Sequence, residues 1–80
     1  MSKKMSQALE TIKSKLYDCA MMAFYMEKTG KEARAKHYSA KVHALHYALE
    51  TLGVENNDIL DIIIRAEDNE LVSLKERGLV

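Results

Sequence analysis

The chain has 80 residues, 12 basic and 12 acidic side chains, one cysteine and no proline. A chain of this length forms one small domain, and such domains bury only ~60% of the surface that the unfolded chain exposes. One cysteine excludes an internal disulfide and is typical of a reducing compartment, so we expect residues 1–80 to form a single cytoplasmic domain. No uncharged run reaches the ~20 residues that a membrane-spanning helix needs.

The two signs of charge are separated along the chain. Residues 1–41 contain nine Lys or Arg against four Asp or Glu, and residues 42–80 contain three against eight. This split is typical of a nucleic-acid-binding face, or of two halves that pair within or between molecules. The net charge of zero favours pairing, because proteins that bind the phosphate backbone carry a surplus of Lys and Arg.

Three glycines, Gly30, Gly53 and Gly78, divide the chain into segments of helical length. Glycine is common just past a helix end because it adopts the left-handed conformation at no steric cost. The absence of proline and the 48% content of hydrophobic residues agree with an all-α fold. The predicted helices span about residues 4–28, 31–52 and 58–77.

The first segment carries two apolar stripes. One has the alternating spacing of four and three residues that is typical of a helix packed lengthwise on another helix: Met5, Leu9, Ile12, Leu16, Cys19, Ala23 and Met26. The second stripe consists of Tyr17, Ala20, Met21, Phe24 and Tyr25. The run Cys19–Met26 is therefore apolar on every side of the helix, and all its sides need to be covered.

The second segment has its own stripe at the same spacing, which consists of Ala35, Tyr38, Val42, Leu45, Leu49 and Leu52. It is offset by two residues from the first, or ~200° around a continuous helix. A reversal at Thr29-Gly30 would let the two stripes face each other, so the sequence predicts an antiparallel helical hairpin. Thr29 and Glu32 have the spacing of a capping box for the second helix.

The third segment is ambiguous between 62 and 74. Polar residues 67–70 separate the apolar run 59–64 from a second one at 71–74, so the helix could be continuous or broken there. The β-branched isoleucines also allow a short hairpin of strands. We favour helix, which gives a bundle-like fold with the third helix packed across the hairpin.

Residues with catalytic or metal-binding chemistry are few. His43 and His46 lie one helical turn apart and could hold a metal if Cys19 or Glu50 supplied further ligands, but they match no known zinc spacing. Cys19 lies in the apolar run, where a small core residue is the simpler interpretation. Gly30-Lys31 lacks the glycine-rich loop that cradles phosphate. We therefore expect no enzyme activity and no cofactor. A metal-binding helical protein that uses His43 and His46 stays as a lesser alternative.

A basic cluster surrounds the start of the second helix: Lys28, Lys31, Arg34, Lys36 and Lys41. It could bind nucleic acid, although no helix-turn-helix pattern accompanies it. The alternative is that it pairs with the acidic stretches 55–61 and 67–70. We favour this pairing and keep a small nucleic-acid-binding regulator as the second hypothesis for function.

Apolar and aromatic side chains on the first helix carry the leading hypothesis. Methionine adapts to irregular surfaces, and aromatic residues are enriched at protein interfaces. The predicted interface consists of Tyr17, Met21, Met22, Phe24 and Tyr25. These residues indicate a non-enzymatic protein–protein interaction module, a small intracellular regulator, adaptor or inhibitor that binds a larger protein. We also expect a homo-oligomer, with a dimer favoured, that associates through the first helix.

Overall fold

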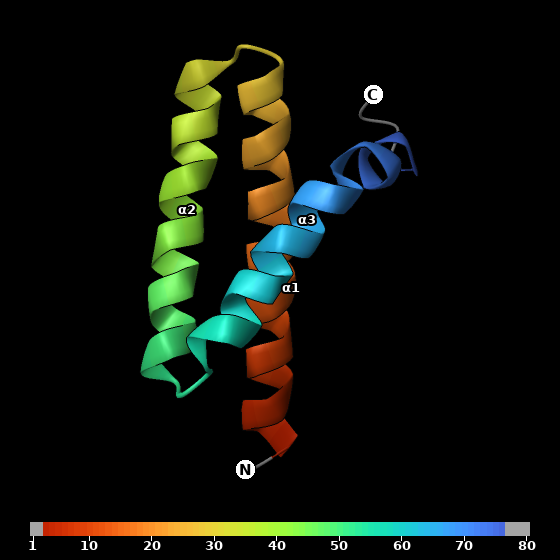
Figure 1. Cartoon of the computed structure of the whole chain (residues 1–80). Helices are drawn as coiled ribbons and strands as arrows, with labels where there is room; N and C mark the ends of the chain where they lie inside the picture. The colour runs from red at the N-terminus through yellow and green to blue at the C-terminus, as the bar shows by residue number, and fades with distance from the viewer. Residues whose placement is uncertain (1–2, 77–80) are drawn as a thin grey trace.

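The computed structural model describes the backbone of residues 3–76 and the side chains of residues 3–69. This part of the chain is all-α, with helices α1 (Lys3–Lys28), α2 (Glu32–Thr51) and α3 (Asn56–Glu76). α1 and α2 form an antiparallel hairpin, and α3 runs obliquely across α1 (Figure 1). The predicted fold class and hairpin are confirmed. Arg77, predicted to end the third helix, lies outside the described residues.

Both glycine turns end the preceding helix as the sequence predicts. Gly30 and Gly53 have φ angles of +77° and +91°. The N–H of Gly53 donates to the carbonyl of Glu50, and the N–H of Val54 donates to that of Leu49, each at 3.0 Å. These two bonds define a Schellman motif, and the turn at Gly30 has the same pair. The hairpin and the turn into α3 are therefore fixed by local backbone chemistry.

Thr29 belongs to the end of α1 and does not cap α2. Its hydroxyl donates to the carbonyl of Tyr25 at 3.0 Å, as threonine commonly does four residues along a helix. Lys31 occupies the N-cap position of α2, where no side chain makes a capping hydrogen bond. The predicted capping box of Thr29 and Glu32 is wrong, because the last turn of α1 takes the threonine before α2 begins.

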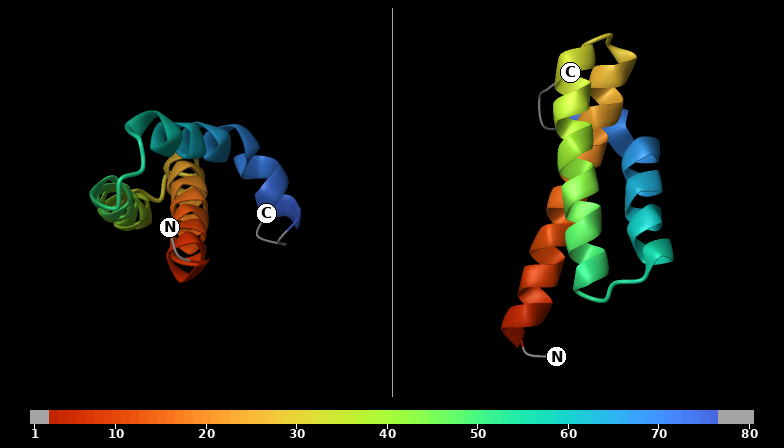
Figure 2. Two further views of the ribbon diagram at one scale, coloured as in Figure 1. Left: turned by 90° about the horizontal axis from the view of Figure 1, so that it is seen from below. Right: turned by 90° about the vertical axis from the view of Figure 1, so that its left-hand side faces the viewer.

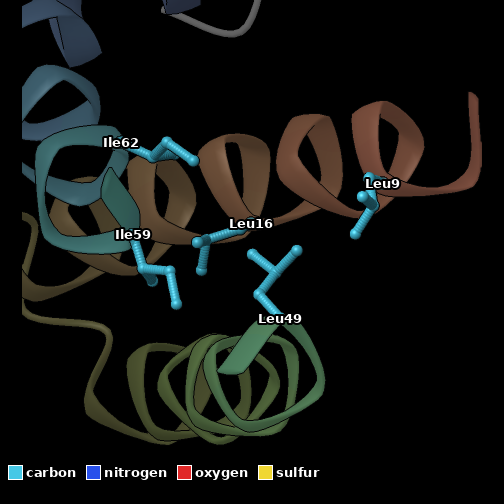
Figure 3. Packing of buried hydrophobic residues seen from close by; sticks show 5 residues of the cluster. All are labelled: Leu9, Leu16, Leu49, Ile59 and Ile62. Carbon is cyan, nitrogen blue, oxygen red and sulfur yellow. The ribbon is translucent and has the colours of Figure 1, made fainter. Parts of the chain in front are cut away.

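The main core lies where the three helices meet. Leu16 from α1, Leu49 from α2 and Ile59 from α3 are fully buried, and Leu9 and Ile62 extend the same cluster. Figure 3 shows these side chains converging between the helices. The predicted stripes of the first two segments therefore do face each other, and α3 completes the core that they begin.

A second cluster attaches the middle of α3 to α1. Ala20 and Met21 of α1 pack with Ala66 of α3, and all three are almost completely buried. Ala20 and Ala66 are small, which lets the two helices approach closely at this crossing. In Figure 2, α2 and α3 lie against different sides of α1. The middle of the second apolar stripe, at Ala20 and Met21, is therefore covered by the chain's own third helix.

The third segment is a single helix, with neither a break nor strands. Ile59, Ile62 and Ala66 are buried at helical spacings of three and four residues, so one face of the helix packs from Ile59 to Ala66. Asp68 and Asn69 fall on exposed positions, where polar side chains cost the helix little. The strand alternative for residues 62–74 is wrong because burial on one helical face outweighs the β propensity of isoleucine.

Candidate functional site: an apolar groove at the hairpin tip

The predicted interface on α1 is largely covered by the chain itself. Each of its five residues is buried or partly buried: Tyr17, Met21, Met22, Phe24 and Tyr25. Met21 has no exposed surface, because it packs with Ala66 of α3. It belongs to the core and cannot touch a partner while α3 stays in place. Tyr17 and Phe24 pack against the same cluster and present only part of their surface.

Among the side chains that the structure describes, the large apolar ones that remain exposed lie elsewhere: Met5, Tyr47, Leu52, Leu60 and Ile64. Leu60 and Ile64 are neighbours one turn apart on α3, and Ile64 is 59% exposed. Tyr47 is on the outer side of α2, two residues and therefore ~200° away from the buried Leu49. Within the described residues, no helix is both long and apolar enough to cross a membrane.

A groove of about 440 Å³ opens at the hairpin tip, and all three helices contribute to it. In Figure 1, α3 starts beside α1 and α2 and then leaves α2 as it crosses α1, so the upper part of the hairpin lies beyond it. We call this cavity the tip groove. Its apolar floor consists of Ala20, Ala23, Phe24, Ala35, Val42 and Ile63.

Small side chains along the hairpin seam, which is the line of contact between α1 and α2, explain why the tip groove stays open. Ala23 and Ala35 occupy seam positions of α1 and α2, where the lower hairpin has leucines such as Leu16 and Leu49. Alanine does not reach far enough to fill the space between the helices. α3 covers the seam near Ile59 but has crossed over to α1 by Ala66. The floor is thus apolar and is left uncovered by larger side chains.

The rim of the tip groove carries charge and one hydroxyl. Glu27 lies on the α1 side, and Glu32, Lys36 and Ser39 lie on the α2 side. Ser39 is exposed although it lines the groove, so it marks the border between floor and solvent. An apolar floor with polar groups at its edge can bury the apolar face of a ligand while the rim sets its orientation.

A second hollow, of about 390 Å³, lies between α1 and the start of α3 and is more polar. Four of its five charged side chains pair locally: Lys13 lies 3.6 Å from Glu10, and Arg65 lies 3.1 Å from Asp61. Because each pair is within one helix and open to solvent on at least one side, it contributes little to stability. This hollow has little apolar surface with which to hold a ligand, so the tip groove is the stronger candidate.

The basic cluster is exposed, but its members face different ways. Lys36 lines the tip groove, whereas Lys41, ~140° further around α2, lies with its Nζ 5.5 Å from the ring centre of Tyr38. Four of the five residues make no ion pair with another described residue: Lys31, Arg34, Lys36 and Lys41. The predicted pairing with the acidic stretches is therefore not made by these four residues inside the described part of the chain.

His46 connects α2 to α3. Its Nε2 is 2.9 Å from Oδ1 of Asn56, the first residue of α3, and 3.0 Å from Oε1 of Glu50. Both neighbours are acceptors, so Nε2 is assigned as the protonated nitrogen. His43 is exposed one turn earlier. In the part of the chain that the structure describes, no three His, Cys, Asp or Glu side chains come together as a metal site.

Comparisons with protein-family models, with curated proteins and with solved structures found no match to this chain. The interpretation of the tip groove therefore rests on its own residues. They comprise an apolar floor from three helices, with two glutamates, a lysine and Ser39 at the rim.

Proposed function

We propose that this chain is a non-enzymatic protein-interaction module that binds an apolar helix of a larger protein in the tip groove. It would act as a small regulator, adaptor or inhibitor by occupying a surface of that protein. The observation that supports this proposal most is the groove itself, about 440 Å³ with a floor of six apolar residues. Helix-in-groove recognition uses surfaces of this kind, with anchors at i, i+3 or i+4 and i+7.

The shape of the surface favours a helix over a compact small molecule. The groove runs between two helices and continues to α3, where Ile63 lines it and Leu60 lies one turn before. Its lining extends over residues 20–27 of α1 and 32–42 of α2, about two to three turns of each helix, which is the length over which a helical ligand places anchors at i, i+3 or i+4 and i+7. At the rim, Glu27 and Glu32 favour a basic side chain on the partner, and Lys36 favours an acidic one.

Replacing Ser39 by arginine tests this proposal. Ser39 is exposed and lies in a helix, so arginine is compatible with the fold, yet its long side chain would project over the apolar floor. We expect a protein that the parent chain captures from native lysate to be lost, or reduced at least about tenfold, with Ser39→Arg, since one blocked anchor costs ~1–2 kcal/mol.

Lys41→Gln is the matched control, because Lys41 is exposed on the same helix but points away from the groove. It should capture the same protein as the parent chain. Equal capture by Ser39→Arg and the parent chain would contradict the proposal. So would loss of capture with Lys41→Gln alone.

A further inference from the structure

The two signs of charge are separated in space as well as along the chain. α3 contributes four Asp or Glu against one Arg over residues 56–69, and it crosses one side of the hairpin. In Figure 2, no helix of the described part of the chain lies on the other side of α1 and α2. We call that open side of the hairpin the rear face.

The rear face of α2 is basic. Leu49 is fully buried in the main core and marks the direction in which α2 faces α1. Glu50 and Glu32, which lines the tip groove, both lie ~100° from Leu49 around the helix, on the side of α3. Arg34 and Lys41 lie ~60° and ~80° from Leu49 in the opposite direction. The acidic and basic side chains of α2 thus point to opposite sides of the hairpin.

The rear face of α1 is basic as well. Leu16 is its fully buried reference, and Tyr17, which packs with α3, lies ~100° to one side of it. Lys15 and Lys4 lie ~100° and ~120° from Leu16 in the other direction. The nearest acidic residue of α1, Asp18, is partly buried and lies ~60° further around the helix, on the side away from α2.

The four basic side chains of the rear face follow the length of the hairpin. Lys4 and Lys15 are ~16 Å apart along α1, and Arg34 and Lys41 are ~10 Å apart along α2. All four are exposed, and none makes an ion pair with another residue that the structure describes. The rear face is therefore a row of positive charge that the described acidic residues do not neutralise.

We propose that the rear face binds the phosphate backbone of a nucleic-acid duplex without reading its sequence. Lys and Arg make such contacts, and a DNA duplex offers about one phosphate per 1.7 Å of its axis. Single strands bind by stacking bases on open aromatic rings, whereas Tyr38 at this face is partly buried and has Nζ of Lys41 5.5 Å from its ring centre. A membrane surface requires an apolar face, and the most exposed apolar side chains, Tyr47 and Ile64, lie on other faces.

This inference does not depend on the proposed function, because the rear face and the tip groove lie on different sides of α2. Lys41→Gln separates the two surfaces. It removes one of the four rear-face charges, so it should weaken duplex binding about tenfold at low salt. Capture of a protein in the tip groove, from lysate treated with nuclease, should be unchanged. Failure of either proposal therefore leaves the other in place.

Fluorescence anisotropy with a labelled DNA duplex tests the inference. The longest dimension of the chain, 40 Å, corresponds to about 12 base pairs, so a duplex of about 20 base pairs is long enough. Four phosphate contacts predict binding that weakens about 100-fold between ~50 mM and ~200 mM salt. Lys15→Gln and Arg34→Gln each remove one contact and should each weaken binding about tenfold at ~50 mM salt. Absence of binding at that salt concentration would overturn the proposal.

Lys13→Gln is the matched control. It removes the same charge from the same helix, but Lys13 lies ~160° around α1 from Lys15 and pairs with Glu10. Its affinity for the duplex should stay near that of the parent chain, and a loss as large as that of Lys15→Gln would overturn the proposed surface. A single strand of the same sequence and vesicles that contain phosphatidylserine are the competing probes. Both should bind more weakly than the duplex, and tighter binding of either one would overturn the assignment of the partner.

Discussion

Replacing Leu16 by alanine is expected to lower the free energy of unfolding by about 3 kcal/mol. Leu16 has no exposed surface and packs between Leu49 of α2 and Ile59 of α3, so its removal opens a cavity where all three helices meet. A domain of this length has a total stability of only roughly 4 to 12 kcal/mol. Urea denaturation followed by circular dichroism should show a much lower midpoint.

Leu52→Ala is the matched control for this prediction. Leu52 is 41% exposed at the end of α2, so the same chemical change there should cost less than about 1 kcal/mol. Similar losses for the two variants would mean that the junction of the three helices is not the centre of the core.

Replacing Met21 by alanine is expected to cost about 3 kcal/mol as well. Met21 is fully buried with Ala20 and Ala66, so its side chain helps to hold α3 on α1. The other two fully buried residues of this cluster are alanines, which cannot extend to fill the space that methionine leaves. The measurement is again the urea midpoint.

Met22→Ala separates a core role of Met21 from a general effect of methionine in this run. Met22 is the next residue on α1 but is only partly buried, so its loss should cost well under half as much. The contrary outcome is that Met21→Ala unfolds at the same urea midpoint as the parent chain but no longer associates with other copies. Met21 would then be an interface residue, as the sequence predicts.

Helix periodicity and glycine positions made most of the fold predictable. Gly30 and Gly53 end two helices through backbone bonds that depend only on nearby residues. The seam positions of Leu16 and Leu49 follow from the spacing of apolar residues in each helix. The role of Thr29 was predicted wrongly because its hydroxyl can either donate to a carbonyl at the end of α1 or accept from an N–H at the start of α2. The sequence is compatible with both, and the structure shows the bond to the carbonyl of Tyr25.

What covers each apolar face could not be predicted. Periodicity indicates that Met21 and Phe24 share a second stripe, but the pattern is the same whether the cover is a partner or another part of the chain. The deciding contact, Ala66 against Ala20, joins residues 46 positions apart and depends on the angle at which α3 crosses α1. That angle depends on the packing of all three helices together.

The tip groove had a weak signal in the sequence. Ala23 and Ala35 are small residues at seam positions on either side of the turn at Gly30, and small residues can mean either close helix contact or unfilled space. The structure leaves space because α3 leaves α2 as it crosses α1, so α3 does not cover this part of the hairpin. Nothing in the sequence around Ser39 indicates that this polar, exposed residue lies at the rim of the groove.

Methyl spectra of alanine-labelled protein test the central claim, that the tip groove is the binding surface, most directly. Ala23 and Ala35 line the groove, whereas Ala33, Ala40 and Ala44 are exposed on α2 and do not line it, so one sample holds both probe and control. On addition of a captured partner, we predict that the methyl signals of Ala23 and Ala35 shift while those of the other three stay. Shifts confined to Ala33, Ala40 and Ala44 would contradict the claim.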